Sequence, residues 1–163
     1  MKKLVTGATG LVGSHLLLDL VKRGENVRAL KRANSDISAV KKLFANKKVL
    51  PIGKDLGWAA IEWIEGDVLD LSSIENAMEG VDEVYHCAAV VSFNHEEAAA
   101  MMKINVEGTA NVVNICLDKK IKKLCFVSST AAIGSSKNGD LITEKNKWRD
   151  GKTESKYSLS KHL

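Results

Sequence analysis

The sequence predicts an α/β protein with a doubly wound parallel sheet, and three observations support this fold class. Short apolar runs alternate with amphipathic segments from residue 3 to residue 127, a glycine-rich turn follows the first run, and the last run is apolar at nearly every position. Parallel strands need a helical crossover and are buried on both faces, which gives this pattern. We expect a single domain over residues 1–163.

The first three elements form a β-α-β unit. A strand over residues 3–5 runs into the glycine-rich turn, and the helix after it reaches Arg23 before Gly24 ends it. The apolar positions of this helix share one face, and they are Leu11, Val12, Leu16, Leu20 and Val21. A second strand is expected over 26–30, parallel to the first.

The pattern is weaker between the second and third strands. We expect a short helix over 35–44, a loop over 45–60 because of its proline and two glycines, and an alternating strand over 61–65. The sequence S-x-x-E at 72–75 has the spacing of a capping box, which predicts a helix that ends near Gly80.

Two further strands complete the predicted sheet. The fourth covers 82–86 and the fifth covers 123–127, whose apolar composition indicates that both of its faces are buried. Between them, N-x-x-E at 94–97 predicts the start of a long helix that reaches about Leu117. A last helix is expected over 154–163.

Composition and charge exclude several classes of function. With 45% hydrophobic and 27% charged residues, the chain reads as an ordinary globular protein. The net charge is only +4 and the lysines are scattered, so we expect no nucleic-acid partner, and no apolar run is long enough to predict a membrane partner. Three cysteines lie in apolar runs without metal-ligand spacing, which predicts reduced thiols, no metal site and a cytoplasmic protein.

The turn TGATGLVG at residues 6–13 predicts an anion site. A helix N-terminus carries unpaired N–H groups and about half a positive charge, so it binds a phosphate that can approach it. Gly7 would turn the chain out of the strand, Gly10 would leave room for a pyrophosphate, and Gly13 would let helix and strand pack closely. Glycines that only cap and pack the unit are the alternative.

Tyr157 and Lys161 lie four residues apart in the last predicted helix, and therefore on one face of it. An ammonium near a phenol favours the ionised phenol, so this pair could transfer a proton near neutral pH. The same spacing also occurs by chance on many helices.

Ser129 follows the fifth strand, at the sheet edge where open α/β folds bind ligands. Its hydroxyl could hydrogen-bond and polarise a carbonyl oxygen, with Thr130 as the neighbouring candidate. A serine that only caps a turn is the structural alternative. No histidine has the sequence context of a hydrolase triad, so we expect no hydrolase.

Six motifs occur in a fixed order along the chain. They are TGATGLVG at 6–13, GDV at 66–68, HCAA at 86–89, INVEGTANV at 104–112, VSST at 127–130 and YSLSK at 157–161. Together they resemble the extended short-chain dehydrogenases/reductases, also called the NAD-dependent epimerase/dehydratase family, which implies a Rossmann fold. Within this family, VRALKR and AAVVSF are most similar to dihydroflavonol-reductase-like and sterol-dehydrogenase-like members.

This resemblance implies a role for each motif. Tyr157 would donate or accept the proton and would also contact the cofactor, Lys161 would bind the nicotinamide ribose, and Ser129 would hold the reacting oxygen. Asn105 would support the site and a proton relay, unless it is a plain polar helix residue. The dinucleotide would be bound by Gly7, Thr9, Gly10, Leu11, Val12 and Gly13 at the pyrophosphate, by Asp67 and Val68 at the adenine, and by Ala88 and Ala89 on the ribose and nicotinamide side. A strand-end cap is the alternative role for Asp67.

The position that selects between NAD and NADP carries cations. Sites that prefer NAD place an acidic residue about twenty positions beyond the glycine turn, whereas a 2′-phosphate is bound by an arginine. This sequence has Lys31 and Arg32 there, and Arg32 resembles the 2′-phosphate ligand of the reductase-like members. We predict NADP as the cofactor and keep NAD as the alternative, since an exposed strand end would also explain the cations.

These residues predict an NADP-dependent oxidoreductase that moves hydride between the cofactor and a small carbonyl or hydroxyl substrate. Two alternatives stay open, an NAD-dependent nucleotide-sugar epimerase or dehydratase and a non-catalytic dinucleotide-sensing protein. The family continues beyond the last helix with a substrate-binding region and dimerises through two helices. We therefore expect a truncated chain that is inactive by itself, and a homodimer.

Overall fold

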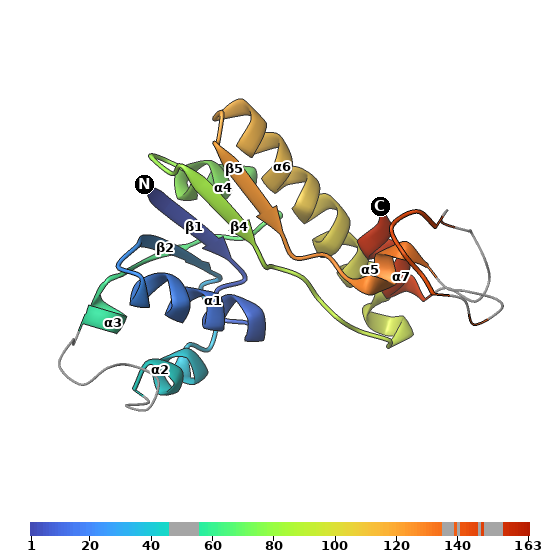
Figure 1. The fold of residues 1–163 in the computed structure, drawn as a ribbon, viewed down its shortest axis with the longest axis horizontal. Coiled ribbons are helices and arrows are strands. Elements are labelled where there is room, and N and C mark those ends of the chain that lie inside the picture. Colours follow the sequence, from blue (N-terminus) through green and yellow to red (C-terminus); the bar gives the residue numbers. More distant parts are fainter. Residues whose placement is uncertain (46–55, 135–138, 140, 147, 149–154) are drawn as a thin grey trace.

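The computed structural model describes residues 1–45, 56–134, 139, 141–146, 148 and 155–163. Within these residues, five parallel strands form one sheet in the order β3-β2-β1-β4-β5 (Figure 1). The strands are β1 (Lys2–Thr6), β2 (Asn26–Lys31), β3 (Ile61–Glu65), β4 (Glu83–His86) and β5 (Lys123–Phe126). The predicted fold class is confirmed, because this is the strand order of a doubly wound sheet.

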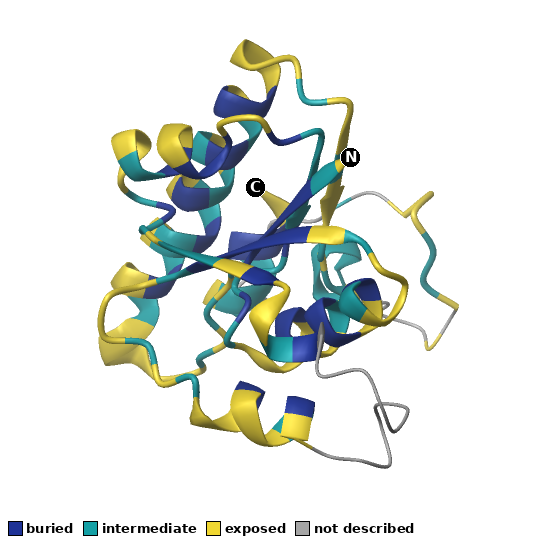
Figure 2. Cartoon of the chain, turned by 90° about the vertical axis from the view of Figure 1, so that its left-hand side faces the viewer, coloured by how far each residue is buried: buried dark blue, intermediate teal, exposed yellow. Residues whose placement is uncertain are grey.

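Helices cover both faces of the sheet. One face carries α1 (Leu11–Lys22), α2 (Ser38–Ala45) and α3 (Leu56–Ala59), and the other carries α4 (Leu71–Ala77) and α6 (Gly108–Asp118). Neighbouring residues of a strand point to opposite faces, so Leu4 packs with α4 and α6 whereas Val5 packs with α1 and α2. Figure 2 shows the buried residues along the central strands and the inner sides of the helices.

The segment between β4 and β5 is not the uninterrupted α-helix that the sequence predicts. Asn94 caps its start, as expected, by accepting a hydrogen bond from the Glu96 N–H. The chain then forms η1 (His95–Glu97), α5 (Ala98–Met102), a π-helical stretch η2 (Lys103–Glu107), and α6. A π-helical turn widens the helix, and such turns often occur at functional sites.

Three other local predictions need correction. Asp70, and not Ser72, caps α4, because its carboxylate accepts the Ser72 N–H. The helix expected from 35 begins at Ser38, since both the N–H and the hydroxyl of Ser38 donate to Asp36. The predicted loop over 45–60 contains the end of α2 and the four-residue helix α3, and its residues 46–55 lie outside the described residues.

The described end of the chain places two short helices beyond β5. They are the 3-10 helix η3 (Thr130–Ile133) and the helix α7 (Lys156–His162), which is capped by Ser155. Helix α7 packs against η3 and α5. No helix in the described ranges is long and apolar enough to cross a membrane.

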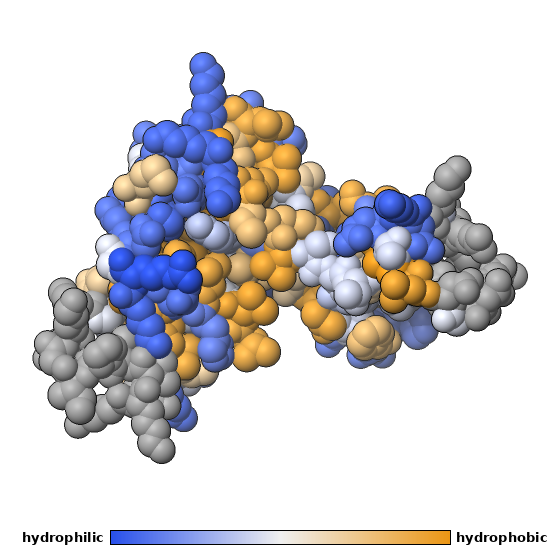
Figure 3. Space-filling model, viewed as in Figure 1, coloured by the Kyte–Doolittle hydropathy of each residue, from blue (hydrophilic) through white to orange (hydrophobic). Residues whose placement is uncertain are grey.

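Strand β5 differs from the prediction of a strand buried on both faces. Lys123, Cys125 and Phe126 are exposed and Leu124 is only half-buried. The apolar pattern was read correctly as a parallel strand, but β5 is the last strand of the described sheet, and β4 is the element with which it makes most of its contacts, so its faces are poorly covered. Figure 3 shows apolar residues at the surface in the middle of the molecule, where Figure 1 places β4 and β5.

Candidate functional site

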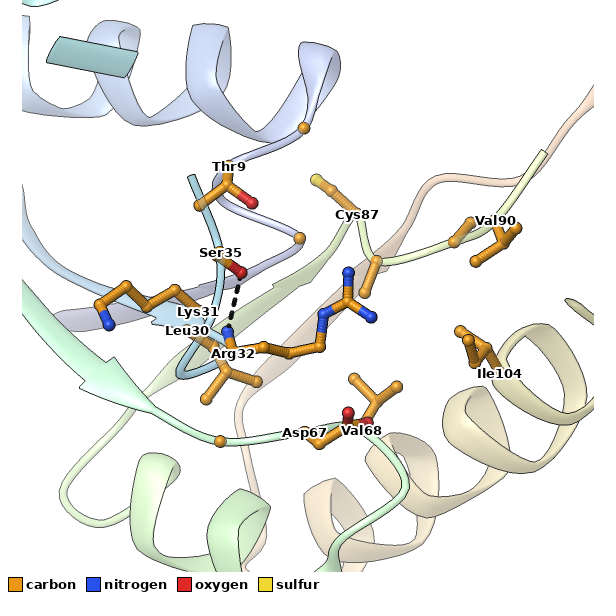
Figure 4. Close-up of a pocket in the computed structure, with 15 residues that line it drawn as sticks. Thr9, Leu30, Lys31, Arg32, Ser35, Asp67, Val68, Cys87, Val90 and Ile104 are labelled. Carbon is orange, nitrogen blue, oxygen red and sulfur yellow. Dashed lines mark hydrogen bonds between the residues drawn. The ribbon is translucent and has the colours of Figure 1, made fainter. Parts of the chain in front are cut away.

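A cavity of about 220 Å³ lies at the carboxyl ends of β1, β2 and β4 (Figure 4). In a doubly wound sheet this is the edge where ligands bind, next to the strands at which the winding direction reverses. Most of the predicted cofactor residues line the cavity, namely Gly7, Thr9, Gly10, Arg32, Asp67, Val68, Ala88 and Ala89. Leu11, Val12 and Gly13 do not line it.

The three glycines of the turn have different surroundings. Gly7 has φ +63°, and a Cβ there would lie 2.5 Å from the Ala88 nitrogen, so its backbone excludes a side chain. A Cβ on Gly13 would overlap the Gly7 carbonyl group. Gly10 is exposed at the N-cap of α1, and its Cβ would meet only the Gly7 oxygen, at 3.3 Å. Gly7 and Gly13 therefore serve the packing, whereas Gly10 keeps the helix N-terminus open to a ligand.

Leu11 and Val12 form the first turn of α1, and both side chains are exposed. Neither side chain faces the cavity, so a contribution to phosphate binding would come from their backbone N–H groups at the helix N-terminus.

The two cations at the end of β2 have different partners. Lys31 forms an ion pair with Glu65 at 2.7 Å. Among the described residues, none accepts a hydrogen bond from the Arg32 guanidinium, and Figure 4 shows this side chain extending into the cavity between Cys87 and Val68. The Ser35 hydroxyl accepts the Arg32 backbone N–H at 3.1 Å and holds the turn.

Asp67 lines the cavity, but its carboxylate already accepts the Leu69 N–H at 2.9 Å. This contact agrees with the strand-end cap that was the structural alternative for Asp67. The Val68 side chain packs closely against Gly108 at the start of α6, where a Cβ would lie 2.6 Å from the Val68 Cγ2. The glycine thus lets α6 approach the floor of the cavity closely.

Ser129, Tyr157 and Lys161 lie outside this cavity, on η3 and α7. The Ser129 oxygen accepts the Ala131 N–H at 3.1 Å, so the cap uses a lone pair and leaves the hydroxyl hydrogen for another acceptor. Thr130, the neighbouring candidate, is exposed.

The tyrosine and the lysine of α7 differ in their degree of burial. The Tyr157 ring is half-buried, 6.1 Å edge-on from the Phe93 ring. Lys161 is 8% exposed, and its ammonium donates to the Val127 carbonyl at 2.9 Å and lies 4.4 Å from the centre of the Phe126 ring. Burial lowers the pKa of the Lys161 ammonium.

Asn105 connects the cavity to α7. Its side chain accepts the Val90 N–H at 2.8 Å and donates to the Val90 carbonyl at 2.9 Å, while its second amide hydrogen binds the Ser160 oxygen at 2.9 Å. Ser160 in turn donates to the Tyr157 carbonyl. Asn105 is only 3% exposed and both of its donors are used, so in this structure it holds two segments in place. Its part in a proton relay stays a prediction.

His86 makes the stability of the fold depend on pH. Burial lowers the pKa of its imidazole from 6.5 to about 4, and the Lys161 ammonium adds to this shift. Below pH 6.5 the unfolded chain binds a proton that the folded chain binds only near pH 4. The free energy of unfolding should therefore fall by about 3 kcal/mol as the pH is lowered through this range.

Urea unfolding of the wild-type chain and of His86→Asn between pH 7 and pH 4 measures this contribution. Asparagine does not titrate, so between pH 7 and pH 4 the free energy of unfolding of the variant should fall by about 3 kcal/mol less than that of the wild type. If the free energy of unfolding fell equally in both proteins, the pH dependence would not come from His86.

Sequence reasoning missed several residues of the site. Val90 and Ile104 line the cavity, and Ser160 links Asn105 to the tyrosine helix. The sequence places Ser160 one turn after Tyr157, and the structure adds that its polar side chain is buried. Cys87 also lines the cavity, where burial raises the pKa of its thiol to about 11 and keeps it protonated.

Several known proteins are similar to this chain in sequence or in fold. Sterol demethylase protein B of Methylococcus capsulatus is 34% identical over 139 residues, which are 85% of this chain and 38% of that protein. Cinnamoyl-CoA reductase 1 of Oryza sativa is 31% identical over 149 residues, which are 90% of this chain and 40% of that protein.

The fold is similar to the crystal structure of Thermus thermophilus UDP-glucose 4-epimerase in complex with NAD, with a TM-score of 0.74 and 26% sequence identity. The match covers 99% of this chain and 48% of the epimerase chain. The chain therefore spans less than half the length of each of these three proteins. The resemblance that the six motifs carry is confirmed over almost the entire sequence. The sequence profile of the NAD dependent epimerase/dehydratase family matches residues 3–163, and the chain belongs to this family.

Proposed function

We propose that residues 1–163 form the dinucleotide-binding domain of an NADP-dependent oxidoreductase that acts on a small carbonyl or hydroxyl compound. The observation that carries the choice of NADP is the guanidinium of Arg32, which extends into the cavity without a carboxylate partner among the described residues. An arginine at this place suits a 2′-phosphate, which it can bind with two parallel hydrogen bonds.

Two neighbouring residues support this choice. Asp36 does not line the cavity, and both of its carboxylate oxygens accept hydrogen bonds from Ser38, so it is not available to a ribose 2′-hydroxyl. Lys31 is bound to Glu65, which leaves Arg32 as the cation that the cavity presents. A neutral ribose edge would gain little from that charge, whereas a phosphate dianion would gain a charge-assisted hydrogen bond.

In the proposed reaction, the cavity would hold the cofactor, and Ser129, Tyr157 and Lys161 outside the cavity would act on the substrate and the nicotinamide end. Bound NADP would supply or accept the hydride. The Ser129 hydroxyl would donate a hydrogen bond to the reacting oxygen, and the Tyr157 phenol would exchange a proton with the same oxygen. The Lys161 ammonium would favour the ionised phenol and bind the nicotinamide ribose.

Replacing Arg32 with aspartate tests the cofactor preference. Loss of a charge-assisted contact and gain of a repelling carboxylate should lower the preference for NADPH over NADH by at least about tenfold. Titration of the chain with each cofactor, followed by fluorescence, gives the two Kd values. Lys31→Met is the matched control, because it removes a neighbouring charge that Glu65 already neutralises, and its ratio should stay near that of the wild type.

An unchanged ratio in Arg32→Asp would remove Arg32 from this role. NAD that copurifies tightly with the chain and is not exchanged would favour the epimerase alternative, to which the likeness to the UDP-glucose 4-epimerase structure also points.

A further inference from the structure

Two buried side chains, Thr6 and His86, and the half-buried Thr109 form a continuous series of hydrogen bonds beneath the cavity. The Nδ1 atom of His86 lies 2.6 Å from the hydroxyl oxygen of Thr6, and its Nε2 atom lies 3.0 Å from the hydroxyl oxygen of Thr109. Thr6 and His86 end the adjacent strands β1 and β4 and are 0% exposed, and Thr109 belongs to α6. One imidazole therefore joins two strands and a helix.

The hydrogen-bonding capacity of these groups fixes where the protons are. The Thr6 oxygen accepts the Ala88 N–H at 3.3 Å, and its own hydrogen must be donated because a buried unpaired donor is costly. Among the described residues, the acceptor in reach is His86 Nδ1. The imidazole then carries its single hydrogen on Nε2 and donates it to Thr109.

The surroundings of the ring favour this neutral form. The His86 ring stacks on Phe126 at 5.5 Å, and the Lys161 ammonium lies 4.4 Å from the centre of that same Phe126 ring. A second positive charge on His86 would repel the ammonium and would turn Nδ1 into a donor that faces the Thr6 hydrogen. The second change would leave the Thr6 hydroxyl hydrogen without its acceptor on His86.

This chain of hydrogen bonds ends at the wall of the cavity. Ala88 lines the cavity opposite Gly7, and the two backbones touch so closely that a Cβ on Gly7 would lie 2.5 Å from the Ala88 nitrogen. Thr6 immediately precedes Gly7, and its hydroxyl holds the Ala88 N–H. The Thr6 hydroxyl thus adds a hydrogen bond to the backbone bond from the Cys87 N–H to the Thr6 carbonyl, and His86 Nδ1 accepts the hydrogen of that hydroxyl.

We propose that His86 is a positioning residue of the dinucleotide pocket, whose neutral Nε2–H form orients the Thr6 hydroxyl so that it holds the Ala88 backbone against Gly7. The inference rests on the dinucleotide-binding part of the proposed function and is independent of the cofactor's 2′-phosphate and of the reaction. His86 touches neither cofactor nor substrate in this role.

Thr6→Val tests the proposal, because it removes the hydroxyl with little change in volume. The Kd of the chain for NADPH should rise about tenfold, and Thr6→Ser, which keeps the hydroxyl, should stay within about threefold of the wild type. Val40→Ala is the control for a purely structural effect, since Val40 is fully buried in the core away from the cavity. It should lower the free energy of unfolding and leave the Kd unchanged.

A second pair of variants distinguishes the contribution of the Nδ1 contact from that of the Nε2 contact. His86→Asn places an oxygen near the Nδ1 position and can still accept from Thr6, whereas His86→Gln reaches Thr109 but gives up the acceptor next to Thr6. The Kd of His86→Asn should therefore stay closer to the wild-type value than that of His86→Gln. Nitrogen NMR of the histidine ring in the wild-type chain should show a hydrogen on Nε2 and none on Nδ1.

Two results would overturn the inference. One is a hydrogen on Nδ1 of His86, and the other is an unchanged Kd in Thr6→Val when the wild type binds NADPH normally. Failure of the proposed function looks different, because the wild-type chain would then bind neither NADPH nor NADH. In that case faster hydrogen exchange of the Ala88 amide in Thr6→Val than in Val40→Ala would support the hydrogen-bond chain, and equal exchange would refute it.

Discussion

Replacing Tyr157 with phenylalanine is expected to lower turnover by about 10²-fold to 10⁴-fold, the range that general acid-base groups contribute, in a form of the protein that turns over substrate. The change removes the phenolic oxygen and keeps the ring, so the edge-on contact with Phe93 and the fold of α7 should be preserved. Cofactor affinity should stay within about twofold, because Tyr157 does not line the nucleotide cavity. Steady-state kinetics and a cofactor titration on the same preparation measure both quantities.

Lys156→Ala is the matched control for this experiment, since Lys156 is the exposed first residue of the same helix. It should leave turnover unchanged. If Tyr157→Phe also turned over normally, the phenol would have no part in the chemistry. The non-catalytic dinucleotide-sensing alternative would then explain the chain better.

Alanine at Gly13 should lower the stability of the fold, whereas alanine at Gly10 should lower the affinity for the dinucleotide. In Gly13→Ala the new Cβ overlaps the Gly7 carbonyl, so β1 and α1 must separate, and the free energy of unfolding should fall by about 2–4 kcal/mol. In Gly10→Ala the Cβ meets only one oxygen at 3.3 Å, and the backbone at φ −79° and ψ 173° accepts alanine. That variant should fold normally and bind the dinucleotide at least about tenfold more weakly.

Urea unfolding and cofactor titration of both variants give the four values needed. A Gly10→Ala variant that binds as tightly as the wild type would show that no phosphate approaches this helix N-terminus. A Gly13→Ala variant of wild-type stability would show that α1 can move away from β1 at little cost.

The elements that the sequence predicts best are those with local causes. The five strands follow from runs of apolar residues, and the start of α1 follows from the glycines of the turn. The cap of α4 was missed by two positions because Asp70 and Ser72 are both good capping residues, and the backbone decides between them. The π-helical stretch has no local signal, since it accompanies the contact of Asn105 with Val90, fifteen residues away.

The residues of the candidate site also differ in whether local sequence predicts their place. Gly7, Thr9, Gly10 and Arg32 could be placed at the cavity from their spacing, because a β-α-β unit brings its turns to one sheet edge. The link between Thr6 and His86 joins residues 80 positions apart, and no periodicity in the sequence reports it. The exposure of β5 was equally out of reach, because its residues are as apolar as those of a covered strand.

The Asn105 contact divides the segment after β4 into a fixed part and a changeable part. Up to Val90 the chain is held by buried hydrogen bonds, whereas the side chains of Val91 and Phe93 just beyond it are exposed. Phe93 contacts the Tyr157 ring, so a substitution there acts on the tyrosine helix, whereas the Val91 side chain lines no part of the nucleotide cavity. The chain can therefore change its sequence at Val91 during evolution while the Val90 backbone and the cavity beside it keep their shape.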